Sequence, residues 1–172
     1  MFRIICGCII VLGFTYIGRL YAEREKSRLA QLDAFCDGLN MLEFNIRYMN
    51  FPMAEAFKRV AEGCSQPIKA VFEEASRIMS EEYEVSSGEA FCRGIDKNKN
   101  KMTLSYDEME IVKSFALSLG KGDRKAEIVN IESAKVRLSA SCQDAKEEVN
   151  KKVKMTKSIS TLAGILIVIV LI

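Results

Sequence analysis

Apolar residues recur at spacings of three and four positions between residues 22 and 157, the period of an amphipathic α-helix. The clearest stretch runs from Ala22 to Asn50, and we predict one helix that continues directly from the apolar sequence before it. Its apolar positions are Leu29, Leu32, Cys36, Leu39, Leu42, Ile46 and Met49. No competing segment alternates strictly between apolar and polar residues, as a half-buried strand would. The sequence therefore predicts an all-α fold.

Start signals divide the rest of this region into further helices. A proline suits the first turn of a helix, and the spacing Ser-x-x-Glu is that of a capping box. These signals are, in chain order, Pro52, Pro67, Ser86-x-x-Glu89, Ser105-x-x-Glu108 and Asp123. The helix after Asp123 is predicted to be the longest, with a heptad-like seam typical of a coiled coil. Together the signals predict a bundle of about six helices.

The segment from Ser158 to Ile172 contains no charged residue. A helix from Ile159 onward would be about 21 Å long, and one from Met155 about 27 Å, against about 30 Å of hydrocarbon. In the longer helix Lys157 would reach back toward the lipid headgroups. A buried core helix would show a polar face, and this segment has none. We predict a C-terminal membrane anchor at residues 158–172, either a span or one half of a re-entrant hairpin.

A second apolar run covers Ile4 to Leu20 and is interrupted only by Arg19. We predict an uncleaved transmembrane helix at residues 1–22. The alternative is a secretory signal peptide, which has a shorter apolar region and an A-x-A-like cleavage site. Leu20-Tyr21-Ala22 is a poor version of that site. N-terminal sequencing of the mature protein distinguishes the two interpretations.

Between the two apolar runs, residues 23–157 form one block of a size that suits a single domain. The chain has 25 Lys and Arg and 23 Asp and Glu, and two of the basic residues, Arg3 and Arg19, precede this block. The block is therefore electrically neutral, which argues against a nucleic-acid partner. Its inner flanks are basic at both ends, so the positive-inside rule places it in the cytoplasm.

The residues that carry enzyme chemistry are sparse. The sequence has no histidine, no P-loop and no Gly-x-Gly-x-x-Gly motif, and its six cysteines form no Cys-x-x-Cys pair. Asp96 to Asn100 begins like a calcium loop, but Lys101 occupies the position where the loop requires glycine. We predict a protein without enzymatic activity, cofactor or bound metal.

Two motifs resemble a known family. Leu42-Glu43-Phe44-Asn45-Ile46-Arg47-Tyr48, followed by Phe51-Pro52-Met53-Ala54-Glu55-Ala56, is similar to a signature of the stage III sporulation protein AB family. Leu117-Ser118-Leu119-Gly120-x-x-Asp123 and the apolar C-terminus also match. The resemblance covers essentially the whole chain, in order and spacing. One departure is that Ala126-Glu127 stands where the family pattern leads us to expect a glutamine.

The resemblance implies a role in endospore-forming bacteria. Members are similar to the cytoplasmic helical domains of the platform protein of type II secretion and type IV pilus systems. The implied protein is a non-enzymatic scaffold in the mother-cell membrane around the forespore, which docks a cytoplasmic secretion-type ATPase to a channel built with other stage III membrane proteins.

The polar residues inside the matched motifs are candidates for partner contacts: Glu43, Arg47, Tyr48, Glu55 and Asp123. Two of them also have a structural interpretation, Tyr48 as a buried tyrosine with its partner and Glu55 as an acid on a helix surface. The alternative function is a membrane-anchored helical sensor, or an extracytoplasmic scaffold, with the block on the other side of the membrane.

Overall fold

The computed structural model describes the backbone of residues 2–82 and 84–171, and the side chains of residues 16, 19, 20, 22–82, 84–149, 151 and 155. The described residues form six α-helices, one π-helical turn and one 3-10 turn, with no strand. The elements are α1 (Phe2–Phe44), η1 (Asn45–Met49), α2 (Met53–Gly63), α3 (Ile68–Glu81), α4 (Ser87–Asn98), η2 (Lys99–Lys101), α5 (Tyr106–Ser118) and α6 (Arg124–Leu171). The predicted all-α bundle of about six helices is confirmed.

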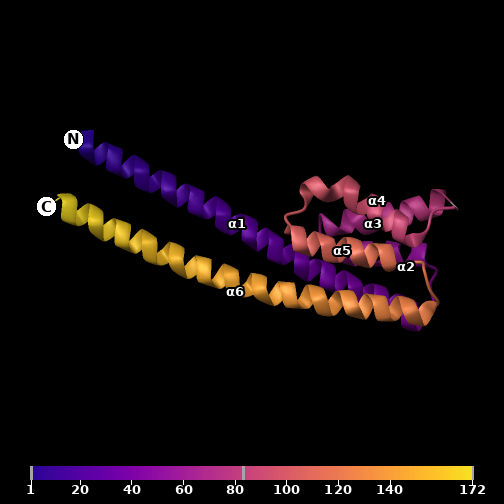
Figure 1. Cartoon of the computed structure of the whole chain (residues 1–172). Helices are drawn as coiled ribbons and strands as arrows, with labels where there is room; N and C mark the ends of the chain where they lie inside the picture. Colours follow the sequence, from indigo (N-terminus) through magenta and orange to yellow (C-terminus); the bar gives the residue numbers. More distant parts are fainter. Residues whose placement is uncertain (1, 83, 172) are drawn as a thin grey trace.

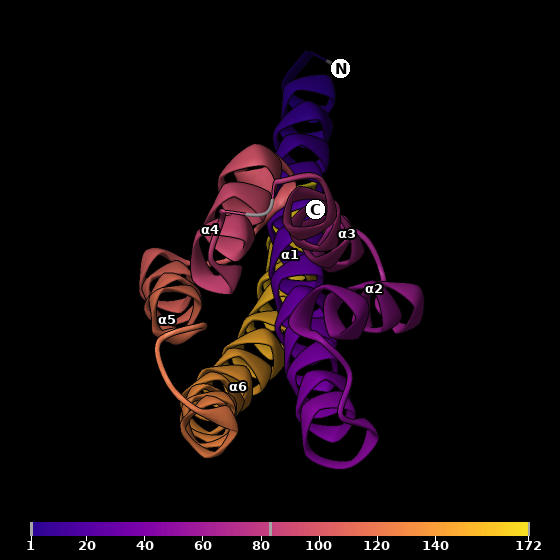
Figure 2. The same ribbon diagram turned by 90° about the vertical axis from the view of Figure 1, so that its right-hand side faces the viewer.

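The two long helices, α1 and α6, lie side by side and project together beyond the four short helices (Figure 1). Each helix packs on the next one in sequence, and α6 returns to pack on α1. Viewed along the long helices, α2 and α3 lie to one side of the α1–α6 pair and α4 and α5 to the other (Figure 2). We call the end from which α1 and α6 project the proximal end, and the opposite end, which holds η1, the distal end.

The helices begin where the sequence predicts. Ser86 and Ser105 each accept a hydrogen bond from the backbone three residues on, and Ser105 forms a complete capping box with Glu108. Asp123 Oδ1 accepts from the Ala126 amide at 2.9 Å, so it caps α6. Pro52 and Pro67 directly precede α2 and α3. Each of these signals acts within one turn of its helix.

The core is built around five phenylalanines, one from each of α1 to α5. Neighbouring ring centroids in this group lie between 5.1 and 6.2 Å apart, mostly tilted or edge to face. Such pairs stabilise a core by about 0.5–1.5 kcal/mol beyond the area that they bury. The rings are Phe35, Phe57, Phe72, Phe91 and Phe115. The cluster ties the four short helices to α1 and so makes the bundle one unit.

The long helices also run through the two apolar segments of the sequence. Most side chains of the spans predicted at residues 1–22 and 158–172 lie outside the described residues. Among the residues that the structure describes, none of the helices combines the length and apolar character that a membrane crossing needs.

Candidate contact surface

The distal end of α1 widens into the π-helical turn η1. The amide of Asn50 bonds to the carbonyl of Asn45, five residues back, and Asn50 itself takes the left-handed conformation with φ 58°. Arg124 at the start of α6 donates from Nε to the carbonyl oxygen of Ile46 at 2.7 Å. One of the carbonyls left over at the end of a helix is thereby satisfied by a side chain from the other long helix.

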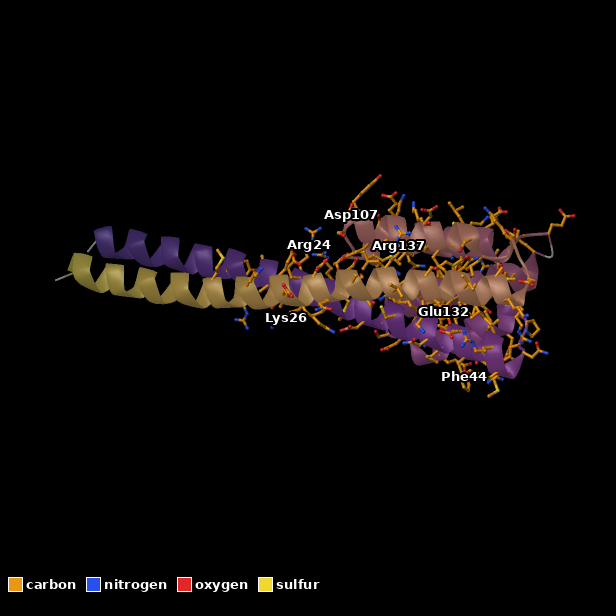
Figure 3. All side chains as sticks on the ribbon, turned by 60° about the horizontal axis from the view of Figure 1, so that its bottom comes forward. Arg24, Lys26, Phe44, Asp107, Glu132 and Arg137 are labelled. Carbon is orange, nitrogen blue, oxygen red and sulfur yellow. The ribbon has the colours of Figure 1, made fainter. Side chains whose placement is uncertain are left out.

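Three large apolar side chains at this turn face solvent. The exposed fractions are 50% for Phe44, 67% for Tyr48 and 48% for Met49. The rings of Phe44 and Tyr48 lie against each other, with centroids 5.3 Å apart. Figure 3 shows Phe44 at the end of the bundle away from the projecting helices. We call Phe44, Tyr48 and Met49 the distal apolar surface.

The predicted contact residues Glu43 and Arg47 are engaged with each other and with α6. Arg47 Nη2 lies 2.9 Å from Glu43 and 2.6 Å from Glu132, and Lys135 Nζ lies 2.7 Å from Glu43. The Glu43 side chain is only 14% exposed, so this network brings charge close to the helix interface. Because the Glu43 carboxylate bridges Arg47 and Lys135, this network holds the end of α1 against α6, and we call it the clamp.

Glu55, in the first turn of α2, pairs with Arg59 one turn later at 3.0 Å. The guanidinium carbon of Arg59 in turn lies 4.2 Å from the centroid of Phe51, in cation–π geometry. Arg59 also lines an open groove of about 640 Å³ between α1 and α2. The groove is formed by Asn40, Met41, Phe44, Asn45, Arg59, Glu62 and Gly63. Glu55 therefore holds a side chain that borders this groove.

The distal end thus gathers all five predicted contact residues without making them one cluster. Glu43, Arg47 and Tyr48 occupy two successive turns, and Tyr48 is exposed rather than buried. Asp123 is exposed and caps α6, which gives it a structural role in the fold. Glu55 is the helix-surface acid of its alternative interpretation. Whether these residues touch a partner stays a prediction.

Two buried acids make interactions that the sequence analysis did not predict. Glu108 on α5 binds Arg28 on α1, with Oε1 and Nη2 2.7 Å apart, and its side chain is 2% exposed. Glu127 on α6 accepts the Gly120 amide at 2.5 Å through Oε1, while its buried Oε2 has no partner in the described residues. Burial raises the pKa of Glu127, and the Gly120 hydrogen bond only partly opposes this. The available sequence signal for Glu108 was its capping-box spacing, and for Glu127 it was the departure from the family pattern.

The surroundings of two thiols, those of Cys64 and Cys142, favour the protonated form. Burial raises the pKa of Cys64 to about 11, and burial together with the nearby Asp33 carboxylate raises that of Cys142 to about 11. Both thiols are therefore protonated near neutral pH, and only the thiolate attacks or ligates. Their surroundings are those of core residues.

The described residues contain no group of three or more side chains placed to hold a metal ion. The segment that begins like a calcium loop is helical instead: its first part completes α4, and the rest forms η2. Asn98, one of its potential ligands, is buried and donates to the carbonyl of Gly94 at 3.0 Å. Its side-chain amide is thus used inside the bundle.

The fold and the distal apolar surface define a helical-bundle protein with a candidate docking surface at one end and two projecting helices at the other. Comparison with known proteins adds the family. The model of the stage III sporulation protein AB family matches residues 3–172, so the chain belongs to that family.

Two known proteins of this family are similar to the chain. Stage III sporulation protein AB of Bacillus subtilis (strain 168) is 30% identical over 175 residues, which cover 99% of each chain. A solved structure of stage III sporulation protein AB superposes with a TM-score of 0.67 at 27% identity and covers 72% of this chain and 97% of the solved one. The family that the sequence motifs predicted is thereby confirmed.

Proposed function

We propose that this protein is a non-enzymatic scaffold of a sporulation complex, anchored in the mother-cell membrane around the forespore. It docks a cytoplasmic secretion-type ATPase to a channel that contains other stage III membrane proteins. Membership of the stage III sporulation protein AB family supports the sporulation role. Support for the anchors comes from the apolar sequences at residues 4–20 and 158–172, which α1 and α6 carry away from the bundle on one side (Figure 1).

The distal apolar surface is the proposed ATPase contact. The observation that carries this proposal is an exposed aromatic pair, Phe44 and Tyr48, at the end of the bundle farthest from the apolar segments. Aromatic residues at the centre of a patch with a polar rim are typical of protein interfaces. A surface at this end lies as far from the bilayer as the bundle allows, where a soluble partner can reach it.

Two of the charged candidates lie near that aromatic pair, because Arg47 directly precedes Tyr48 and Glu55 holds Arg59, which lines the groove beside Phe44. Arg47 and Glu55 are partly exposed and form a polar rim. Glu43 holds Arg47 in place, and Asp123 begins the helix that supplies Lys135 and Glu132 to the clamp. In this arrangement the ion pairs hold the end of α1 on α6, so the backbone that carries the aromatic pair is ordered before binding, which reduces the entropy lost on binding.

Co-purification tests this contact. The full chain is produced with the ATPase, extracted in mild detergent and captured, and the retained ATPase is quantified. Tyr48→Ala, or the double variant Phe44→Ala/Tyr48→Ala, should weaken the complex by about thirtyfold, the effect of losing an interface hot spot of about 2 kcal/mol. The matched control is Tyr106→Ala, since Tyr106 is 83% exposed but begins α5 at the proximal end. Equal retention by all variants would remove the distal apolar surface from the proposal.

The cytoplasmic side of the proposal has its own test. With the native cysteines replaced by alanine, Lys121→Cys places one thiol in the exposed connection between α5 and α6. A membrane-impermeant thiol reagent should label it only after the membrane is opened. Labelling in intact cells would place the bundle outside and favour a sensor or an extracytoplasmic scaffold.

A further inference from the structure

Five exposed basic side chains gather at the proximal end of the bundle. They come from three segments far apart in the sequence, namely the first long helix, η2 and the last long helix. Within the described residues, none of the five forms an ion pair. They are Arg24, Lys26, Lys99, Lys101 and Lys151, and we call them the proximal basic cluster.

Hydrogen bonds hold the η2 segment beside α1. The Thr103 amide donates to Gln31 Oε1 at 2.8 Å, and the Thr103 and Ser27 hydroxyls are 3.4 Å apart. Lys101 and Ser27 also line the same surface groove. The connection from α4 to α5 lies at the end from which the long helices project (Figure 1), and Figure 3 shows Arg24 and Lys26 on opposite sides of those helices. The cluster therefore extends around this end.

Three acids of the proximal end are paired with one arginine that does not belong to the cluster. Arg28 binds Glu25 at 3.2 Å, Glu108 at 2.7 Å and Glu148 at 3.3 Å. These three carboxylates are thus concentrated on one partly buried guanidinium. Of the other exposed acids near this end, Glu23 pairs with Arg19 at 3.8 Å and Asp96 pairs with Lys113 at 3.3 Å. Asp107 and Glu147 are exposed near the five cations and form no ion pair within the described residues.

The cluster lies next to the apolar sequences. At about 1.5 Å per residue, Arg24 stands about 6 Å along α1 from Leu20, and Lys151 stands about 10 Å along α6 from Ser158. Ser27, which marks the level of η2 on α1, stands about 10 Å from Leu20. These separations are comparable with the Debye length of about 8 Å at physiological ionic strength, so the charges can act on a surface at the edge of those segments. The sequence adds Lys152, Lys154 and Lys157 between Lys151 and the apolar run.

We infer that the proximal basic cluster binds the phosphate headgroups of anionic lipids and holds this end of the bundle against the membrane surface. The inference rests on the membrane anchoring proposed above. Cations arranged around one end suit a flat anionic surface, and each lysine near such a surface strengthens binding by about fivefold. The bundle then stands upright, with the distal apolar surface pointing away from the bilayer.

The test uses the full chain in vesicles, with Asn100→Cys carrying a fluorophore in a background without native cysteines. Asn100 is exposed and lies between Lys99 and Lys101. A lipid with a quencher on its headgroup reports when η2 touches the membrane. Quenching should be strong in vesicles with roughly one third phosphatidylglycerol and weak in pure phosphatidylcholine. Raising NaCl to about 1 M, where the Debye length is about 3 Å, should remove the difference.

Charge removal supplies the matched comparison. Lys99→Gln/Lys101→Gln should reduce the population of the quenched state in anionic vesicles by at least about tenfold. The control is Lys121→Gln/Lys125→Gln, which removes two exposed lysines at the distal end and should change nothing. Quenching that is equal in both lipids, or unaffected by the η2 substitutions, would overturn the inference.

Flotation on pure phosphatidylcholine vesicles separates the two proposals. Neutral vesicles offer no charge, so the chain floats with them only if its apolar segments anchor it. Flotation without charge-dependent quenching overturns the lipid contact and leaves the anchor intact. A chain that fails to float overturns the anchor and the inference that rests on it.

Discussion

The guanidinium of Arg28 and the carboxylate of Glu108 join α1 to α5 across the bundle. Arg28 Nη2 donates to Glu108 Oε1 at 2.7 Å, and Nε donates to both carboxylate oxygens at 3.0 and 3.1 Å. Glu108 Oε2 also accepts the Ser105 amide at 2.7 Å, which completes the capping box. One carboxylate therefore starts α5 and attaches it to the long helix.

Removing this charge should destabilise the bundle. Glu108→Gln leaves Arg28 without its most buried counter-ion, and we expect the free energy of unfolding to fall by about 2 kcal/mol. This loss is below the usual range for a broken buried pair, because Glu25 and Glu148 still contact Arg28. Thermal unfolding of the purified full chain in detergent, followed by circular dichroism, measures the change. The control, Glu110→Gln on an exposed part of α5, should stay within about 0.5 kcal/mol. Equal effects of the two variants would contradict a structural role for the Arg28–Glu108 pair.

Glu127 should make stability depend on pH. Because burial raises the pKa of this carboxyl in the folded state, the protonated form favours folding, and that contribution is lost as pH rises through the raised pKa. The Glu127→Gln side chain cannot ionise. Between acidic and neutral pH, the free energy of unfolding of the variant should therefore rise relative to that of the wild type by roughly 1 kcal/mol, the scale of an unpaired buried group.

Unfolding curves of both proteins across this pH range test the prediction. Glu62→Gln, on the exposed surface of α2, serves as the control and should run parallel to the wild type. A Glu127→Gln curve that also runs parallel would show that the raised pKa does not act on folding.

Gly94 permits the close approach of α3 and α4. A Cβ added at Gly94 would lie 2.7 Å from the backbone oxygen of Val71. Replacing glycine by alanine inside an exposed helix stabilises a protein by about 1 kcal/mol. For Gly94→Ala we expect the free energy of unfolding to fall by about 2 kcal/mol, because the Val71 oxygen cannot move aside without shifting α3.

Gly63→Ala is the matched control for that substitution, with the same denaturant titration as readout. The atoms nearest to its added Cβ belong to the end of the flexible Met41 side chain, which can take another rotamer. We expect a change below about 1 kcal/mol. A Gly94→Ala protein as stable as Gly63→Ala would mean that α3 and α4 can separate freely.

Arg124 should limit opening of the distal turn. Its Nε donates to the Ile46 carbonyl, so Arg124→Gln should speed amide hydrogen exchange in η1 by about tenfold, the effect of one lost charge-assisted hydrogen bond. Arg137→Gln, on the exposed face of α6, is the control (Figure 3). Exchange that is unchanged in η1, or increased throughout the bundle, would contradict a local role.

The helix starts were predictable because their causes are local. Ser105 and Asp123 each bond to a backbone amide three residues away, and Pro52 stands directly before the helix that it precedes. The spacing of Ile68, Val71 and other apolar positions likewise follows from the period of a single helix. These features need no knowledge of the rest of the chain.

Pairings between distant segments were not predictable in the same way. Arg28 and Glu108 are 80 residues apart, and nothing near either one specifies the other. Glu43 was predicted as a partner contact because motif polarity alone does not reveal Lys135, 92 residues later. Tyr48 was open to a buried or an exposed interpretation, since the π-helical turn η1 that carries it, and the Arg124 side chain that bonds to this turn from 78 residues later, cannot be read from its own neighbours in the sequence.

The unbroken course of α1 has a mechanical consequence. The helix runs from Phe2 to Phe44 without a break, a length of about 64 Å, and its last turns are clamped to α6 by Glu43 and Arg47. A continuous helix has no joint at which a rotation or a push can be absorbed. A force applied at Phe44, the last residue of α1, would therefore be transmitted along the helix axis, through the bundle and into the projecting apolar segment.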